Sequence, residues 1–114
     1  PKKVYGCEVW RDLDWLPDEE KVYLDCGGHP NLMRALSAVF DSQIAGGKRY
    51  DLWAEGRRLA NATFSASHAC DTYTALNYAM DLTPLMDETV DIADYITAAI
   101  ERFKTQVKEN IAKF

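Results

Sequence analysis

The chain has 114 residues, of which 47% are hydrophobic and 27% are charged, a composition typical of one soluble globular domain. Its formal net charge of −5 argues against a protein that binds nucleic acid or acidic membranes, since both need a dominant basic face. The sequence has no apolar run of membrane-spanning length and no signal-peptide pattern, and its three cysteines are widely spaced. We therefore expect a cytoplasmic protein without disulfide bonds.

The predicted elements begin with two short strands. Residues 4–10 and residues 21–26 are both rich in β-branched and aromatic side chains, which favours strands. Pro17 marks a turn in the acidic connection between them. The glycine pair at 27–28 ends the second strand.

Two helices are predicted next. Pro30 suits a first helical turn and Asn31 suits a cap, and apolar residues then follow at helical spacing as far as residue 44. The glycine pair at 46–47 supplies the stop. The second helix is expected over about residues 49–64. Its buried side is expected to carry Trp53, Ala60 and Phe64.

The remainder of the chain predicts a loop, a strand and a long helix. Residues 65–74 are small and polar, as in loops, while residues 75–80 fit either a strand or a helix. We favour the strand, because the segment 81–84 closes it quickly. A continuous apolar stripe from residue 92 to residue 111, with acids at its start and lysines towards its end, predicts the last helix. The expected fold class is α/β, a single domain with a few short strands and three main helices.

A cluster of polar and cationic residues lies between the two central helices. Backbone N–H groups at a helix start favour an anion, and the planar fork of arginine suits a carboxylate or a phosphate. An intramolecular ion pair with an acidic side chain would account for an arginine at position 57 or 58 as well as a ligand would. The carboxamide at position 43 either caps a backbone group or lines a pocket. The candidate substrate-binding residues are Gln43, Lys48, Arg49, Arg57 and Arg58.

Two other chemistries are considered and set aside. Cys26, His29, His68 and Cys70 are residue types that bind zinc, but structural zinc sites usually show more tightly spaced ligand pairs. A nucleotide P-loop at residues 46–48 is rejected, because an arginine stands where serine or threonine should follow the lysine. We therefore assign no catalytic residue and no metal ligand in this chain.

Four segments in order resemble the C-terminal part of the PIG-L/LmbE family of N-acetylglucosaminyl deacetylases. They are residues 5–10 (YGCEVW), 42–51 (SQIAGGKRYD), 56–64 (GRRLANATF) and 80–85 (MDLTPL). More narrowly, they resemble the branch joined to glucosamine-6-phosphate deaminase-like proteins. The resemblance implies a zinc-dependent hydrolase that acts on N-acetylglucosamine-type conjugates. It also implies that this chain is the helix-rich C-terminal portion of a Rossmann-like αβα LmbE-type fold.

The metal-binding motif of that family is missing from the sequence. The family holds its zinc with an Ala-His-Pro-Asp-Asp-type segment and a later histidine, whereas His29 and Pro30 precede Asn31 and Leu32. The resemblance therefore implies a chain that is inactive alone, with zinc bound by the N-terminal half of a parent protein and an acylated amino sugar as substrate. We also expect an exposed apolar patch that drives homo-oligomerisation.

The alternative is a non-catalytic binding or interaction domain. It would recognise a small anion or a sugar at the cationic cluster of Lys48, Arg49, Arg57 and Arg58. A purely structural role, with the helices packed on a partner chain, is a third hypothesis.

Overall fold

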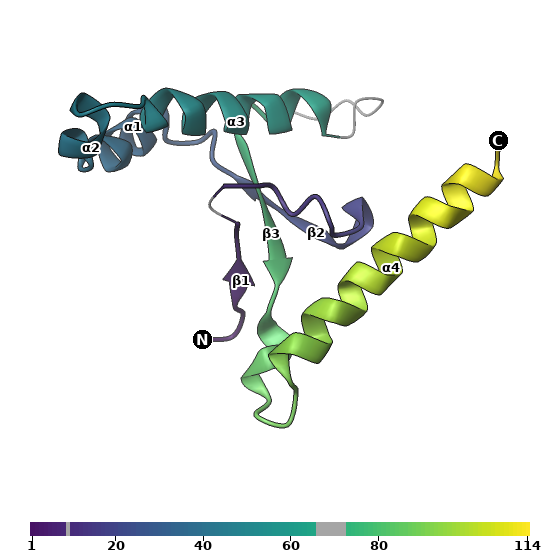
Figure 1. The fold of residues 1–114 in the computed structure, drawn as a ribbon. Coiled ribbons are helices and arrows are strands. Elements are labelled where there is room, and N and C mark those ends of the chain that lie inside the picture. Colours follow the sequence, from purple (N-terminus) through teal and green to yellow (C-terminus); the bar gives the residue numbers. More distant parts are fainter. Residues whose placement is uncertain (9, 66–72) are drawn as a thin grey trace. The chain divides into compact units, whose positions relative to one another are not determined.

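The computed structural model of the chain describes residues 1–8, 10–65 and 73–114 (Figure 1). The described part combines helices with a small sheet, so the prediction of a mixed α/β fold class is confirmed. The three strands are β1 (Tyr5–Gly6), β2 (Lys21–Asp25) and β3 (Leu76–Asp81). The four α-helices are α1 (Pro30–Ala38), α2 (Asp41–Ala45), α3 (Tyr50–Phe64) and α4 (Ile92–Ala112).

Strand β3 is the middle strand of the sheet. The strand order is β1-β3-β2, and β1 pairs antiparallel with β3 so that Tyr5 faces Asp81 and Gly6 faces Met80. The strand predicted at 21–26 and the strand favoured at 75–80 are therefore confirmed as β2 and β3. The first predicted strand is much shorter than expected, because only Tyr5–Gly6 of residues 4–10 is assigned to it, with residue 9 outside the described part.

The chain divides into two compact units. One consists of Pro1–Val22 and Tyr78–Phe114, and the other consists of Tyr23–Asn77. In the first unit, the core is formed by Leu13, Leu16, Met80 and Ala99. Because Ala99 is small and fully buried, the backbone of α4 can approach the rest of this core closely.

The loop before η1, a 3₁₀ turn at Asp18–Glu20, is fixed by one carboxylate in the first unit. Glu8 accepts a hydrogen bond of 2.8 Å from the backbone N–H of Leu13 and one of 2.9 Å from the indole N–H of Trp15. Leu13 has a φ of 58°, a left-handed conformation that costs a side-chain-bearing residue about 1–2 kcal/mol. Burial of the Leu13 side chain, which is 3% exposed, offsets that cost.

Helix α4 confirms the last predicted helix, and Tyr95, Ile96 and Ala99 are its contacts with the core. Asp91 caps it by accepting from the backbone N–H of Asp94 at 2.9 Å, and the hydroxyl of Tyr95 donates to the carbonyl of Asp81 at 2.5 Å. Burial, together with the Asp81 charge, raises the pKa of Tyr95. Further along, the apolar stripe emerges into solvent, since Val107 and Ile111 are exposed. Among the described residues, no helix combines the length and the apolar character needed to cross a membrane.

In the second unit, the first predicted helix is two helices. The amide of Phe40 donates to the carbonyl of Ser37 at 3.2 Å, which closes α1 with a 3₁₀-type bond. The carbonyl of Phe40 then accepts from Gln43 and Ile44, which starts α2. Apolar spacing continues through this break, so the sequence pattern could not reveal it.

Helix α3 confirms the second predicted helix, but its expected buried side is wrong. Trp53 is 42% exposed, Phe64 is 76% exposed, and Ala60 is also exposed. Ala62 is buried instead, next to Asn61, whose amide donates to the carbonyl of Leu76 at 3.2 Å. The side of the helix with Asn61 and Ala62 is buried because the carbonyl of Leu76 needs a hydrogen-bond donor and because alanine is small enough to fit there. The side with the larger aromatic residues stays exposed. The predicted loop at 65–74 falls mainly on residues 66–72, which lie outside the described part.

We predict that Gly56→Ala stabilises the protein. Gly56 lies inside α3, and a Cβ atom placed there meets no other atom within 4 Å. Alanine is favoured over glycine in a helix interior by about 1 kcal/mol, so urea unfolding should show an increase of that size in the free energy of unfolding. Gly47→Ala is the matched control, since Gly47 has equally open surroundings but lies outside a helix. A destabilised Gly56→Ala variant would contradict the prediction.

Candidate functional site

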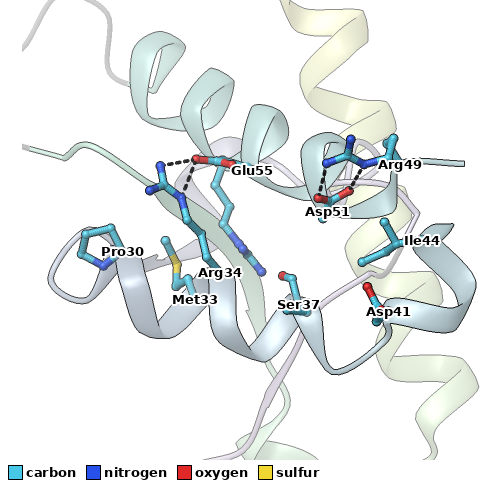
Figure 2. Close-up of a pocket in the computed structure, with 11 residues that line it drawn as sticks. Pro30, Met33, Arg34, Ser37, Asp41, Ile44, Arg49, Asp51 and Glu55 are labelled. Atoms are coloured by element: carbon cyan, nitrogen blue, oxygen red, sulfur yellow. Dashed lines mark hydrogen bonds and ion pairs between the residues drawn. The ribbon is translucent and has the colours of Figure 1, made fainter.

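A cavity of about 320 Å³ lies among α1, α2 and α3, within the second unit (Figure 2). Its apolar lining comes from Pro30, Met33, Ala38 and Ile44. Its charged lining comes from Arg34, Asp41, Arg49, Asp51, Glu55 and Arg58. Three cations and three carboxylates thus surround a partly apolar space, and their pairing determines what the cavity can bind.

Arg34 and Glu55 connect α1 to α3 across the cavity. The Nη2 and Nε atoms of Arg34 donate to Oε1 of Glu55 at 2.9 and 3.3 Å, as drawn in Figure 2. Both side chains are largely exposed, so the pair is expected to contribute at most about 1 kcal/mol to stability. Its main consequence is that this guanidinium and this carboxylate compensate each other, so neither needs a charged group of a ligand.

Arg49 and Asp51 form the second ion pair, at the start of α3. The guanidinium donates from Nε to Oδ1 at 2.9 Å and from Nη2 to Oδ2 at 2.7 Å, which is a two-pronged contact (Figure 2). These bonds lower the pKa of Asp51 to about 2 and raise the pKa of Arg49. Both groups therefore remain charged over the whole physiological range and neutralise each other.

Arg58 and Asp41 are the two lining charges that this pairing leaves over. Arg58 is half-buried on α3, and Asp41 is exposed at the first position of α2. Within residues 1–8, 10–65 and 73–114, neither side chain has a hydrogen bond or an ion pair. Arg58 therefore presents an uncompensated guanidinium to the cavity, and Asp41 presents an uncompensated carboxylate.

The structure brings together two of the five residues expected to bind substrate. Arg49 and Arg58 line the cavity, whereas Gln43 and Lys48 are exposed and do not line it. Arg57 lies over the ring of Trp53, 4.9 Å from the ring centroid, in a cation–π contact. The sequence left open which arginine of the pair faces a pocket, and the structure places Arg58 there.

Sequence reasoning missed Arg34, Asp41, Asp51 and Glu55. A signal was present, because the charged lining residues of α3, namely Asp51, Glu55 and Arg58, recur at helical spacing on one face. The lining residues of α1 follow the same spacing. A search for polar faces of the two helices, rather than for a local run of cations, would have found them.

The described residues offer no ligand set for a metal ion. No group of three histidine, cysteine, aspartate or glutamate residues lies close enough to hold one in the described part. His68 and Cys70, two of the four zinc candidates considered from the sequence, lie outside it. The family resemblance places its zinc in the N-terminal half of a parent protein, so that zinc site stays a prediction.

No protein-family model, no curated protein and no solved structure matches this chain. The resemblance carried by the four sequence segments accordingly stays a prediction.

We predict that the stability contributed by Asp51 disappears in acid. Its pKa is about 2 when folded, below the ordinary value near 4 of an unfolded aspartate, so the carboxylate stabilises the folded state above about pH 4. That stabilisation should be lost as the pH falls from about 4 to about 2. Urea unfolding across this range should show the wild type losing its advantage over Asp51→Asn. A constant difference between the two proteins would contradict the role of the Arg49 pair.

Proposed function

We propose that this chain is the C-terminal, ligand-binding part of a zinc-dependent N-deacetylase. The substrate class is an N-acetylglucosamine-type conjugate, and the cavity among α1, α2 and α3 receives its anionic or sugar portion. The four segments that resemble the PIG-L/LmbE family support the enzyme class, and the mixed α/β elements are compatible with a helix-rich portion of a Rossmann-like αβα fold.

The observation that carries the proposal is the unpaired, half-buried guanidinium of Arg58. Partial burial of a charge costs free energy unless a partner of opposite charge compensates it. Arginine can form two parallel hydrogen bonds with a phosphate or a carboxylate. An anionic group of a ligand would supply the compensation that Asp51 supplies to Arg49 and that Glu55 supplies to Arg34.

The size and the apolar lining of the cavity also suit a small conjugate. A volume of about 320 Å³ lies at the lower end of the range typical of small-molecule sites. Met33 and Ile44 provide apolar surface, which matches the methyl of an acetyl group or the apolar face of a sugar ring. The charged groups would then set orientation, while the apolar groups add contact area.

The catalytic residues of the proposed enzyme would come from the N-terminal half of a parent protein. Zinc hydrolysis needs about three protein ligands, an open position for water and a carboxylate base. The described residues offer no such set. We therefore propose that zinc and the general base act from the other half of the parent, and that this chain binds and orients the substrate.

A free-standing binding domain is the second candidate function. It is favoured by the fact that every lining residue of the cavity falls between Pro30 and Arg58, so the cavity needs no other segment to form. The upstream reading frame distinguishes the two candidates. A strand ending in His-Pro-Asp-Asp encoded there would support the deacetylase, and a stop codon directly before residue 1 would contradict it.

We predict that Arg58→Gln weakens anion binding by about tenfold, since a hydrogen-bonded charge contributes about 1.5 kcal/mol or more. Inorganic phosphate is the probe, and backbone amide shifts in residues 30–58 are the readout. Arg57→Gln is the matched control, because the neighbouring arginine contacts Trp53 and does not line the cavity. Equal weakening by both substitutions would indicate general electrostatics and contradict a site at Arg58.

We also predict that the isolated chain, supplied with zinc, releases no acetate from N-acetylglucosamine above the protein-free rate. The described residues lack a ligand set for the metal, and the resemblance assigns the zinc motif to the other half. Stoichiometric zinc binding accompanied by turnover would overturn the proposed division of roles.

A further inference from the structure

The cavity leaves two opposite charges uncompensated, not one. Four of its six charged lining groups pair with one another, Arg34 with Glu55 and Arg49 with Asp51. Arg58 and Asp41 line the same cavity from α3 and α2 and are not paired, either with each other or with another described residue. The cavity therefore offers one position for an anion and a separate position for a cation.

A ligand that carries only a negative charge satisfies half of this arrangement. It would compensate Arg58 but not Asp41, whose carboxylate lines the same cavity, and two like charges in one cavity repel each other. A ligand that carries only a positive charge has the converse problem with Arg58. A ligand with both charges compensates both side chains and avoids the repulsion.

We propose that the cavity binds a small zwitterion, with its phosphate or carboxylate at Arg58 and its protonated primary amine at Asp41. Met33 and Ile44 would contact the uncharged carbon atoms between the two charged groups. The inference rests on the proposed function for the role of Arg58 and adds the role of Asp41. Removal of an N-acyl group exposes an amine that is protonated at neutral pH, so the zwitterion corresponds to the product of the proposed reaction.

Asp41 also has a simpler structural role to be separated from this one. It occupies the first turn of α2, where a negative charge interacts favourably with the helix dipole. That role alone predicts a change in stability for Asp41→Asn and no change in ligand preference. The discriminating measurement is therefore a ratio of affinities and not the stability of the variant.

The experiment compares matched probes by backbone amide shifts on the full chain. O-phosphoethanolamine is compared with ethyl phosphate, and β-alanine with propionate, so that each pair differs in the ammonium group and the two pairs distinguish phosphate from carboxylate. In whichever pair binds, phosphate or carboxylate, we expect the zwitterion to bind about fivefold more tightly than the simple anion. This ratio corresponds to the upper end of the free energies measured for exposed charge pairs. Asp41→Asn should abolish this ratio, while Arg58→Gln should weaken both members of the pair. Asp14→Asn, an exposed aspartate of the first unit, is the control and should leave the ratio unchanged.

The outcomes separate the two proposals. Equal affinity of the zwitterion and the simple anion in the wild type would overturn the role of Asp41, while binding that still depends on Arg58 would leave the proposed function intact. A ratio that persists in Asp41→Asn would also overturn that role. Failure of all four probes to shift any amide in residues 30–58 would overturn both proposals.

Discussion

The buried side chains of strand β3 are the constraint on which both units of the chain depend. Leu76 and Ala79 are fully buried, and Met80 joins the core of the first unit. The strand lies between β1 and β2, so its backbone pairs on both edges. The carbonyl of Leu76 also accepts from Asn61 of α3, and the carbonyl of Asp81 accepts from Tyr95 of α4. Within the second unit Leu76 of β3 therefore holds α3, and within the first unit Asp81 of β3 holds α4.

The helices around the cavity bury almost no side chains, unlike the elements that form the core. Neither α1 nor α2, both described in full, has a buried residue, and α3 buries only Ala62. Two ion pairs, Arg34–Glu55 and Arg49–Asp51, hold four of the six charged lining groups in place. Such a site lacks the rigidity that close packing provides. Compensation of Arg58 and Asp41 by a ligand would therefore also stabilise the arrangement of the three helices.

The sequence predicted the elements whose boundaries have local causes. Strand β2 ends before a glycine pair and α4 begins at a capping aspartate, and both lie where expected. The break at Phe40 was not predictable, because apolar spacing continues through it, and the buried side of α3 was not predictable, because it depends on the contact with β3. The periodicity of apolar residues indicates that a helix has an apolar side. It does not indicate that a distant carbonyl, such as that of Leu76, requires the Asn61 amide.

The candidate site was predictable only in part, for a related reason. Consecutive arginines point about 100° apart around a helix, so one sequence pattern serves Arg57 and Arg58 equally. Arg57 contacts the ring of Trp53, which lies four residues earlier in the helix, and this i, i+4 contact could be predicted from the local sequence. The pairing of Glu55 with Arg34, 21 residues away, could not. Only the charged residues that stay unpaired in the folded protein can compensate a charged ligand. Among the six charged residues that line the cavity, these are Arg58 and Asp41.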